Sequence, residues 1–132
     1  CLYCCIFVLL EMKKMYSTLI EKLSDLNDMI IQGRVLEAFD IYYHDEVCIQ
    51  LNANEMIEGK NKNRTYKEQF LSGILEWHSA SPMKVSIGEG ITMVEWLYDF
   101  NHKIEGDKRQ MHVAVQEWKD GKIIKEKLYY NP

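Results

Sequence analysis

The spacing of apolar residues changes once along this 132-residue chain, and that change limits the folds it can adopt. Between residues 15 and 75, apolar residues recur mostly every three or four positions, which indicates helices that bury one face. After Pro82 they recur at every second position, which indicates strands with two different faces. Helices followed by consecutive strands predict an α+β domain in which the helices pack on one face of a sheet.

The expected elements follow from this spacing and from the residues that interrupt it. We expect helices at 15–31, 35–43 and 61–75. We expect strands at 46–51, 83–89, 91–102, 108–118 and 123–130. The last three strands are only a few residues apart, so they should form consecutive antiparallel hairpins. The chain length fits one domain.

The first ten residues contain no charged side chain. A bilayer span needs roughly 20 apolar residues, and a secretory signal needs a basic start and a cleavage site, so neither is predicted here. We therefore separate a hydrophobic extension at 1–14 from a domain at 15–132. Three explanations of the extension stay open: a natural start at one of the next methionines, an ordered arm, or the remnant of an acylated membrane anchor.

Composition argues against several classes of partner and cofactor. The net charge is −4 and the basic residues are scattered, so no concentrated basic face is available for nucleic acid. The four histidines and four cysteines have no metal-ligand or redox-motif spacing, and no Gly-rich phosphate loop is visible. We therefore expect no metal, no cofactor, no nucleic acid and no membrane partner. Cys48 alternates like a strand residue and behaves as a small apolar side chain, which fits a reducing cytoplasm.

Two loops set the expected strand register. Lys119-Asp120-Gly121 has the composition of a three-residue hairpin loop, and residues 105–107 are treated in the same way. The expected pairs are Ala114 with Glu126 and Trp96 with Gln116. One face of the strands then carries most of the aromatic residues and should pack against the helices. The residues expected on this inner face are Val94, Trp96, Tyr98, Phe100, His102, Gln110, His112, Ala114, Gln116, Trp118, Ile124, Glu126, Leu128 and Tyr130.

Three stretches carry a resemblance to a known family. Residues 39–46 read F-x-x-Y-Y-x-D-E, Ile57-Glu58-Gly59-Lys60 precedes the third helix, and residues 118–124 read W-K-D-G-K-I-I before a terminal Leu128-Tyr129-Tyr130. With the order of the elements, they make residues 17–130 resemble the nuclear transport factor 2-like superfamily and, within it, a SnoaL-like domain. The resemblance implies a cone-shaped, cystatin-like α+β fold, with three N-terminal helices on a curved antiparallel sheet around a pocket.

The same resemblance implies a pocket without assigning a reaction. Relatives include ketosteroid isomerases, polyketide cyclases, dehydratases and hydrolases, so the fold does not decide the function. Ketosteroid isomerases use an acid near the end of the first strand, where this chain has Ile49-Gln50-Leu51. Their second pocket acid falls at the position of Ala114, and the pocket Asp of polyketide cyclases has no match.

Glu126 is the sharpest candidate for chemistry, because it lies between Ile124 and Leu128 on the expected inner face. A buried carboxylate must be paired or protonated. His112 is its expected diagonal neighbour across the strand pair, and a Glu–His pair in an apolar pocket can do acid–base work near neutral pH. The alternative is a polar pair that only binds a ligand.

The rest of the inner face is expected to bind the ligand. Its aromatic side chains can stack on a flat molecule, although such residues also form ordinary core. The ligand-binding candidates are Trp96, Tyr98, Phe100, Ala114, Gln116, Trp118, Leu128 and Tyr130. We favour binding of a small apolar or aromatic molecule, because the acid positions of related enzymes are empty. The alternative is a cofactor-independent isomerase, cyclase or dehydratase that uses Glu126 and His112 as its acid–base pair.

The expected outer face of the sheet is too apolar for plain solvent exposure. We therefore expect a homodimer formed through this face, since its charged rim carries both signs and can pair with itself across a two-fold axis. The competing explanation is that residues 1–10 fold over the face within one chain. The apolar residues of the outer face are Met93, Leu97, Met111, Val113, Val115 and Ile123.

Overall fold

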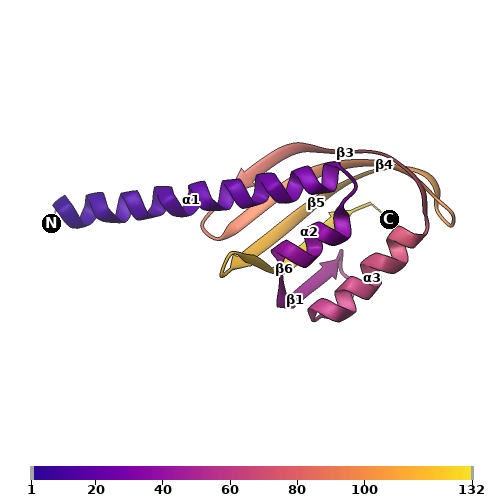
Figure 1. Ribbon diagram of the computed structural model, residues 1–132, viewed down its shortest axis with the longest axis horizontal. Helices are drawn as coiled ribbons and strands as arrows, with labels where there is room; N and C mark the ends of the chain where they lie inside the picture. Colours follow the sequence, from indigo (N-terminus) through magenta and orange to yellow (C-terminus); the bar gives the residue numbers. More distant parts are fainter. Residues whose placement is uncertain (1, 132) are drawn as a thin grey trace.

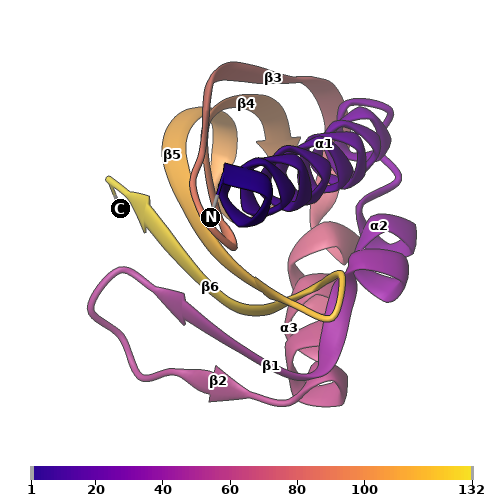
Figure 2. The same ribbon diagram turned by 90° about the vertical axis from the view of Figure 1, so that its left-hand side faces the viewer.

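The computed structural model describes residues 2–131 and confirms the α+β fold. The helices are α1 (Leu2–Ile31), α2 (Val35–Tyr42) and α3 (Lys60–Ser72). The strands are β1 (Tyr43–Leu51), β2 (Ile57–Glu58), β3 (Ile74–Ile87), β4 (Ile91–His102), β5 (Gly106–Lys119) and β6 (Lys122–Tyr130). They form one curved sheet in the order β2-β1-β6-β5-β4-β3, and Figures 1 and 2 show the helices on its concave side.

Helix α1 runs without a break through the expected boundary between residues 14 and 15. It buries apolar residues only from Leu19 onward, and Figure 1 shows its N-terminal half projecting beyond the edge of the sheet. Residues 2–10 are exposed, so the explanation that this segment covers the outer face of the sheet is wrong. Cys1, where the expected extension begins, and Pro132, where the expected domain ends, lie outside the described residues. Within the described part of the chain, no helix is long and apolar enough to cross a membrane.

The sheet is mostly antiparallel, as expected, and one pair of strands departs from this pattern. β1 and β6 are parallel, with Ile49 beside Glu126, and the other neighbouring pairs are antiparallel. A parallel pair needs a long connection, and here the whole intervening chain provides it. β3 begins at Ile74 rather than residue 83, although it contains Pro82. A proline is tolerated there because β3 is the edge strand of the sheet.

Both hairpin turns differ from the expected ones. The β4–β5 turn covers residues 103–105, because His102 Nδ1 accepts the backbone N–H groups of Ile104 and Glu105 at 3.1 and 3.4 Å. His102 is buried, and its Nε2 lies 3.1 Å from the carbonyl oxygen of Phe70. The β5–β6 turn contains only Asp120 and Gly121, both with positive φ, as in a type I′ turn.

These turns change the strand register but keep most residues on their expected face. Trp96 lies opposite His112, and Glu126 lies opposite Gln116 rather than Ala114. Each shift is an even number of residues, and such shifts leave the inner and outer faces unchanged. Ile123 is the exception. The register shifts between Glu117 and Trp118, Ile123 pairs with Trp118, and its side chain is completely buried. Its expected place on the outer face is therefore wrong.

Candidate functional site

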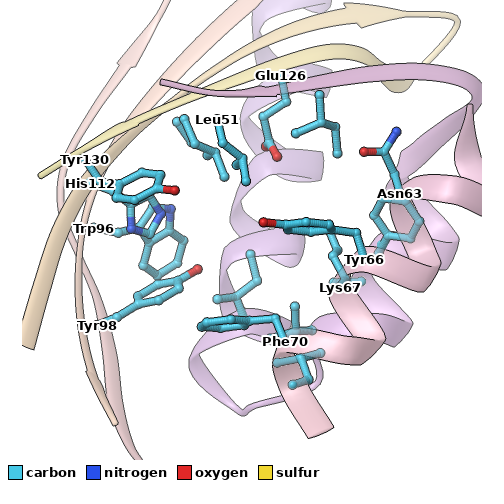
Figure 3. A pocket seen from close by; sticks show the side chains of 18 of the residues that line it. Leu51, Asn63, Tyr66, Lys67, Phe70, Trp96, Tyr98, His112, Glu126 and Tyr130 are labelled. Carbon is cyan, nitrogen blue, oxygen red and sulfur yellow. The ribbon is translucent and has the colours of Figure 1, made fainter. Parts of the chain in front are cut away.

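A cavity of ≈ 240 Å³ lies between the inner face of the sheet and the helices. Figure 3 shows two walls: Trp96, Tyr98, His112 and Tyr130 on the sheet side, and Tyr66, Lys67 and Phe70 on helix α3. Glu126 points its carboxylate into the space between them. Further lining residues include Leu26, Ile30, Phe39, Tyr43, Ile49, Leu51, Asn63, Trp77, Gln110, Ala114, Gln116 and Leu128.

The cavity brings together most of the residues that the sequence singled out. Both candidates for chemistry line it, and so do these ligand-binding candidates: Trp96, Tyr98, Ala114, Gln116, Leu128 and Tyr130. Phe100 does not, because it is buried between the rings of Phe70 and Trp77, at centroid distances of 5.7 and 6.1 Å. Trp118 does not either, since it lies near the turn and borders a groove beside helix α1.

A chain of hydrogen bonds holds Glu126, whose exposed fraction is 2%. Its Oε2 accepts hydrogen bonds from the hydroxyl of Tyr43 at 2.6 Å and from Nε2 of Gln116 at 2.8 Å. Behind Gln116, the Thr92 hydroxyl donates to its Oε1 at 2.7 Å. The indole N–H of Trp118 donates in turn to Thr92 Oγ1 at 2.9 Å. Strands β4, β5 and β6 and the start of β1 thus fix one carboxylate.

Which group donates and which accepts along these hydrogen bonds follows from Trp118 at the outer end of the series. An indole N–H can only donate, so Thr92 accepts from Trp118 and donates its own proton to the amide oxygen of Gln116. The amide nitrogen of Gln116 must then face Glu126 and donate to it. Burial, and next the charge of Glu126, raise the pKa of Tyr43 well above its usual value, so its hydroxyl also remains a donor. Glu126 Oε2 is therefore the acceptor of two hydrogen bonds.

His112 is separate from this chain. The expected diagonal contact with Glu126 is wrong, because Glu126 pairs with Gln116, four residues or about 13 Å along the strand from His112. The His112 ring instead packs nearly perpendicular to the ring of Tyr98, at a centroid distance of 4.5 Å. Burial, and then the charge of Lys67, lower the pKa of His112 to about 4. The imidazole is thus neutral at physiological pH.

Helix α3 contributes a cation that the sequence analysis missed. Lys67 Nζ lies 5.5 Å from the ring centroid of Phe39 and 5.7 Å from that of Tyr43. Its signal in the sequence was its position in the apolar stripe of the helix, three and four residues before Phe70 and Leu71. Thr92 was missed as well, although its parity along the strand is that of the other inward residues.

Asn63, another polar residue that lines the cavity, has structural partners. The buried Asn63 amide donates to the carbonyl oxygens of Ile57 at 2.9 Å and Gly59 at 2.8 Å, which ties helix α3 to the strand before it. Within residues 2–131, no three His, Cys, Asp or Glu side chains are grouped so that they could hold a metal ion.

Helices packed on the concave face of a curved sheet, with a cavity between them, define a nuclear transport factor 2-like protein. The comparison with solved structures agrees. A Mesorhizobium loti SnoaL-like protein, provisionally assigned as a polyketide cyclase and carbohydrate phosphatase, is 21% identical with a TM-score of 0.76, over 85% of this chain and 98% of that one. A Bacillus subtilis protein provisionally assigned as an isomerase is 19% identical with a TM-score of 0.72, over 89% of each chain. An LEH-like epoxide hydrolase of M. tuberculosis is 12% identical with a TM-score of 0.70, over 87% of this chain and 84% of that one.

The sequence assigns the chain to one family within this class of proteins. Residues 18–130 match the SnoaL-like domain family, so the chain belongs to that family. No curated protein sequence is similar enough to count as a match. The structural relatives above have identities at which a likeness shows the fold alone.

Proposed function

We propose that this domain binds one small, mostly apolar molecule in the cavity, with Glu126 as a polar contact. One observation carries the proposal: a buried carboxylate, fixed by two donors, points into a space with aromatic walls. The volume of ≈ 240 Å³ is below the roughly 300–1,000 Å³ of pockets for drug-sized ligands, which favours a compound of one or two rings. The provisional assignments of the relatives as a cyclase and an isomerase also favour a small organic ligand.

Filling the cavity tests this proposal. Ala114 is 3% exposed and lines the cavity, so Ala114→Leu should take up space that a ligand needs. We expect calorimetry with 2-acetylnaphthalene as the probe to show binding to the wild type and at least about tenfold weaker binding to the variant. Val113→Leu, which enlarges the neighbouring residue on the other face, is the control. Equal affinity of Ala114→Leu and the wild type would contradict the proposal.

Acid–base catalysis by Glu126 is the second candidate function. Tyr43 and Gln116 occupy only Oε2, and Oε1 has no hydrogen-bond partner among the described residues. That oxygen is free to take a proton from a bound molecule, while the neutral His112 can donate or accept one elsewhere in the cavity.

A bound ketone distinguishes the two functions. If Glu126 acts as a base, the protein should speed the exchange of the methyl protons of 2-acetylnaphthalene for deuterium, measured by NMR. Glu126→Gln should then slow the exchange by about 10²–10⁴-fold while calorimetric binding persists. A wild type that binds the ketone but exchanges its protons no faster than buffer would leave binding as the function.

We also propose a homodimer formed through the outer face of the sheet. Met93 and Met111 are 44% and 50% exposed on neighbouring strands, and Val113 and Val115 are half-buried beside them. Light scattering should show a dimer, and Val113→Lys should convert it to a monomer because it puts charge in the apolar patch. A monomeric wild type at high concentration would contradict the dimer. A cytoplasmic location stays a prediction from the sequence.

A further inference from the structure

We propose that Lys67 forms an anion-binding subsite in the cavity, so that the ligand is a small ring compound with a carboxylate-like oxygen group. The proposal rests on the cavity being the ligand site, as proposed above. It deepens that function, because it adds a charged group to the class of molecule that the cavity accepts.

Lys67 is the one lysine or arginine side chain among the described residues that line the cavity. Lys67 forms no ion pair and no hydrogen bond with any described residue, and its Nζ lies over the rings of Phe39 and Tyr43. Its ammonium group therefore keeps its three N–H donors available at the cavity wall.

Tyr43 keeps the two charges of the cavity apart. Its hydroxyl binds Glu126 at 2.6 Å, while Lys67 Nζ lies over its ring at 5.7 Å from the centroid. The carboxylate is thus held at one end of the tyrosine side chain, and the cation lies against its face. Because no described ion pair joins Glu126 and Lys67, neither charge is neutralised by the other before a ligand enters.

The charge of Lys67 reaches across the cavity. Figure 3 shows Lys67 on helix α3 and His112 on the opposite wall, and Lys67 contributes to the lowered pKa of His112. A cationic group placed near Lys67 would be repelled by this charge. A neutral, wholly apolar ligand would cover the ammonium without replacing its water, which costs free energy. A ligand that places an anionic oxygen near Lys67 and its ring against Trp96 and Tyr98 pairs with the ammonium group and also packs on the aromatic wall.

Two probes with the same rings but different charge test the subsite. 2-Naphthoate carries a carboxylate, and 2-acetylnaphthalene is neutral. By calorimetry near neutral pH, Lys67→Met should weaken binding of 2-naphthoate at least about tenfold and change binding of 2-acetylnaphthalene by less than about twofold. Lys67→Arg should retain most of the affinity for 2-naphthoate. Lys62→Met, at an exposed position of the same helix, should leave both affinities unchanged.

The outcomes separate this proposal from the proposed function. If Lys67→Met weakens both probes equally, or if the wild type prefers the neutral probe, the anion subsite is wrong and binding in the cavity stands. A loss with Lys62→Met as large as that with Lys67→Met would also overturn the subsite, because it would reflect the net charge alone. If neither probe binds the wild type, the proposed function fails as well.

Discussion

The two walls of the cavity are built differently. On the sheet side, Thr92, Gln116 and Glu126 are 0%, 3% and 2% exposed, and their polar groups bind one another. On the helix side, Tyr66 is 48% exposed, and the Lys67 ammonium lies over two aromatic rings with no ion pair or hydrogen bond to a described residue. Helix α3 has Asn63 as its one buried residue, whereas β4 and β5 bury every second residue over much of their length.

This difference assigns different roles to the two walls. Hydrogen bonds along several strands fix the sheet wall, so it can present a carboxylate in one orientation before a ligand binds. The helix wall is held by fewer buried side chains, so its residues can adjust to the molecule that enters. Changes in the sheet wall should therefore affect folding, and changes in the helix wall should affect mainly binding.

The largest expected effect compares one aromatic residue from each wall. Trp96 is 2% exposed, so Trp96→Ala should lower the free energy of unfolding by about 3–5 kcal/mol. Tyr66 is 48% exposed, and Tyr66→Ala should cost less than about 1 kcal/mol. Urea denaturation of both variants measures the difference. Similar losses would mean that the two walls are equally important for folding.

A pH series gives the next largest effect. The pKa of His112 is lowered from 6.5 to about 4 in the folded protein. The unfolded chain then binds more protons between these two values, so the free energy of unfolding should fall as the pH drops from 6.5 toward 4. The full shift corresponds to about 3 kcal/mol. His112→Gln removes this contribution, so urea denaturation between pH 6.5 and pH 5 should show a flatter profile for the variant. Parallel profiles would contradict the prediction.

The smallest expected effect concerns the outer end of the hydrogen-bond chain. Trp118→Phe removes the donor to Thr92, whereas Trp77→Phe removes a buried indole N–H that has no partner within residues 2–131. Both variants lose the same atoms, so Trp118→Phe should be less stable than Trp77→Phe by about 1 kcal/mol in urea denaturation. If Trp77→Phe lowers the free energy of unfolding as much as Trp118→Phe or more, the hydrogen-bond chain contributes little to the stability of the sheet wall.

Much of this arrangement was predictable from the sequence. The change from helical to alternating spacing predicted the fold class, and the stretches at 39–46 and 118–124 indicated the family whose match covers residues 18–130. The inward position of Glu126 was also predicted, because alternation along a strand is a local property. Phe100 and Trp118 were wrongly predicted to line the cavity, because alternation predicts the face on which a residue lies but not whether that part of the strand borders the cavity.

The partners of Glu126 were decided by the tertiary structure. His102 fixes the β4–β5 turn through two backbone N–H groups, and a two-residue turn at Asp120-Gly121 shifts β6 against β5. The turn at Asp120-Gly121 places Gln116 rather than His112 beside the carboxylate, whereas the β4–β5 turn places Trp96 opposite His112. Tyr43 and Lys67 reach the cavity from elements far from β6 in the chain. The sequence determined which face each strand residue occupies, since that depends on near neighbours, whereas the contacts within the cavity depend on register and on the packing of distant segments.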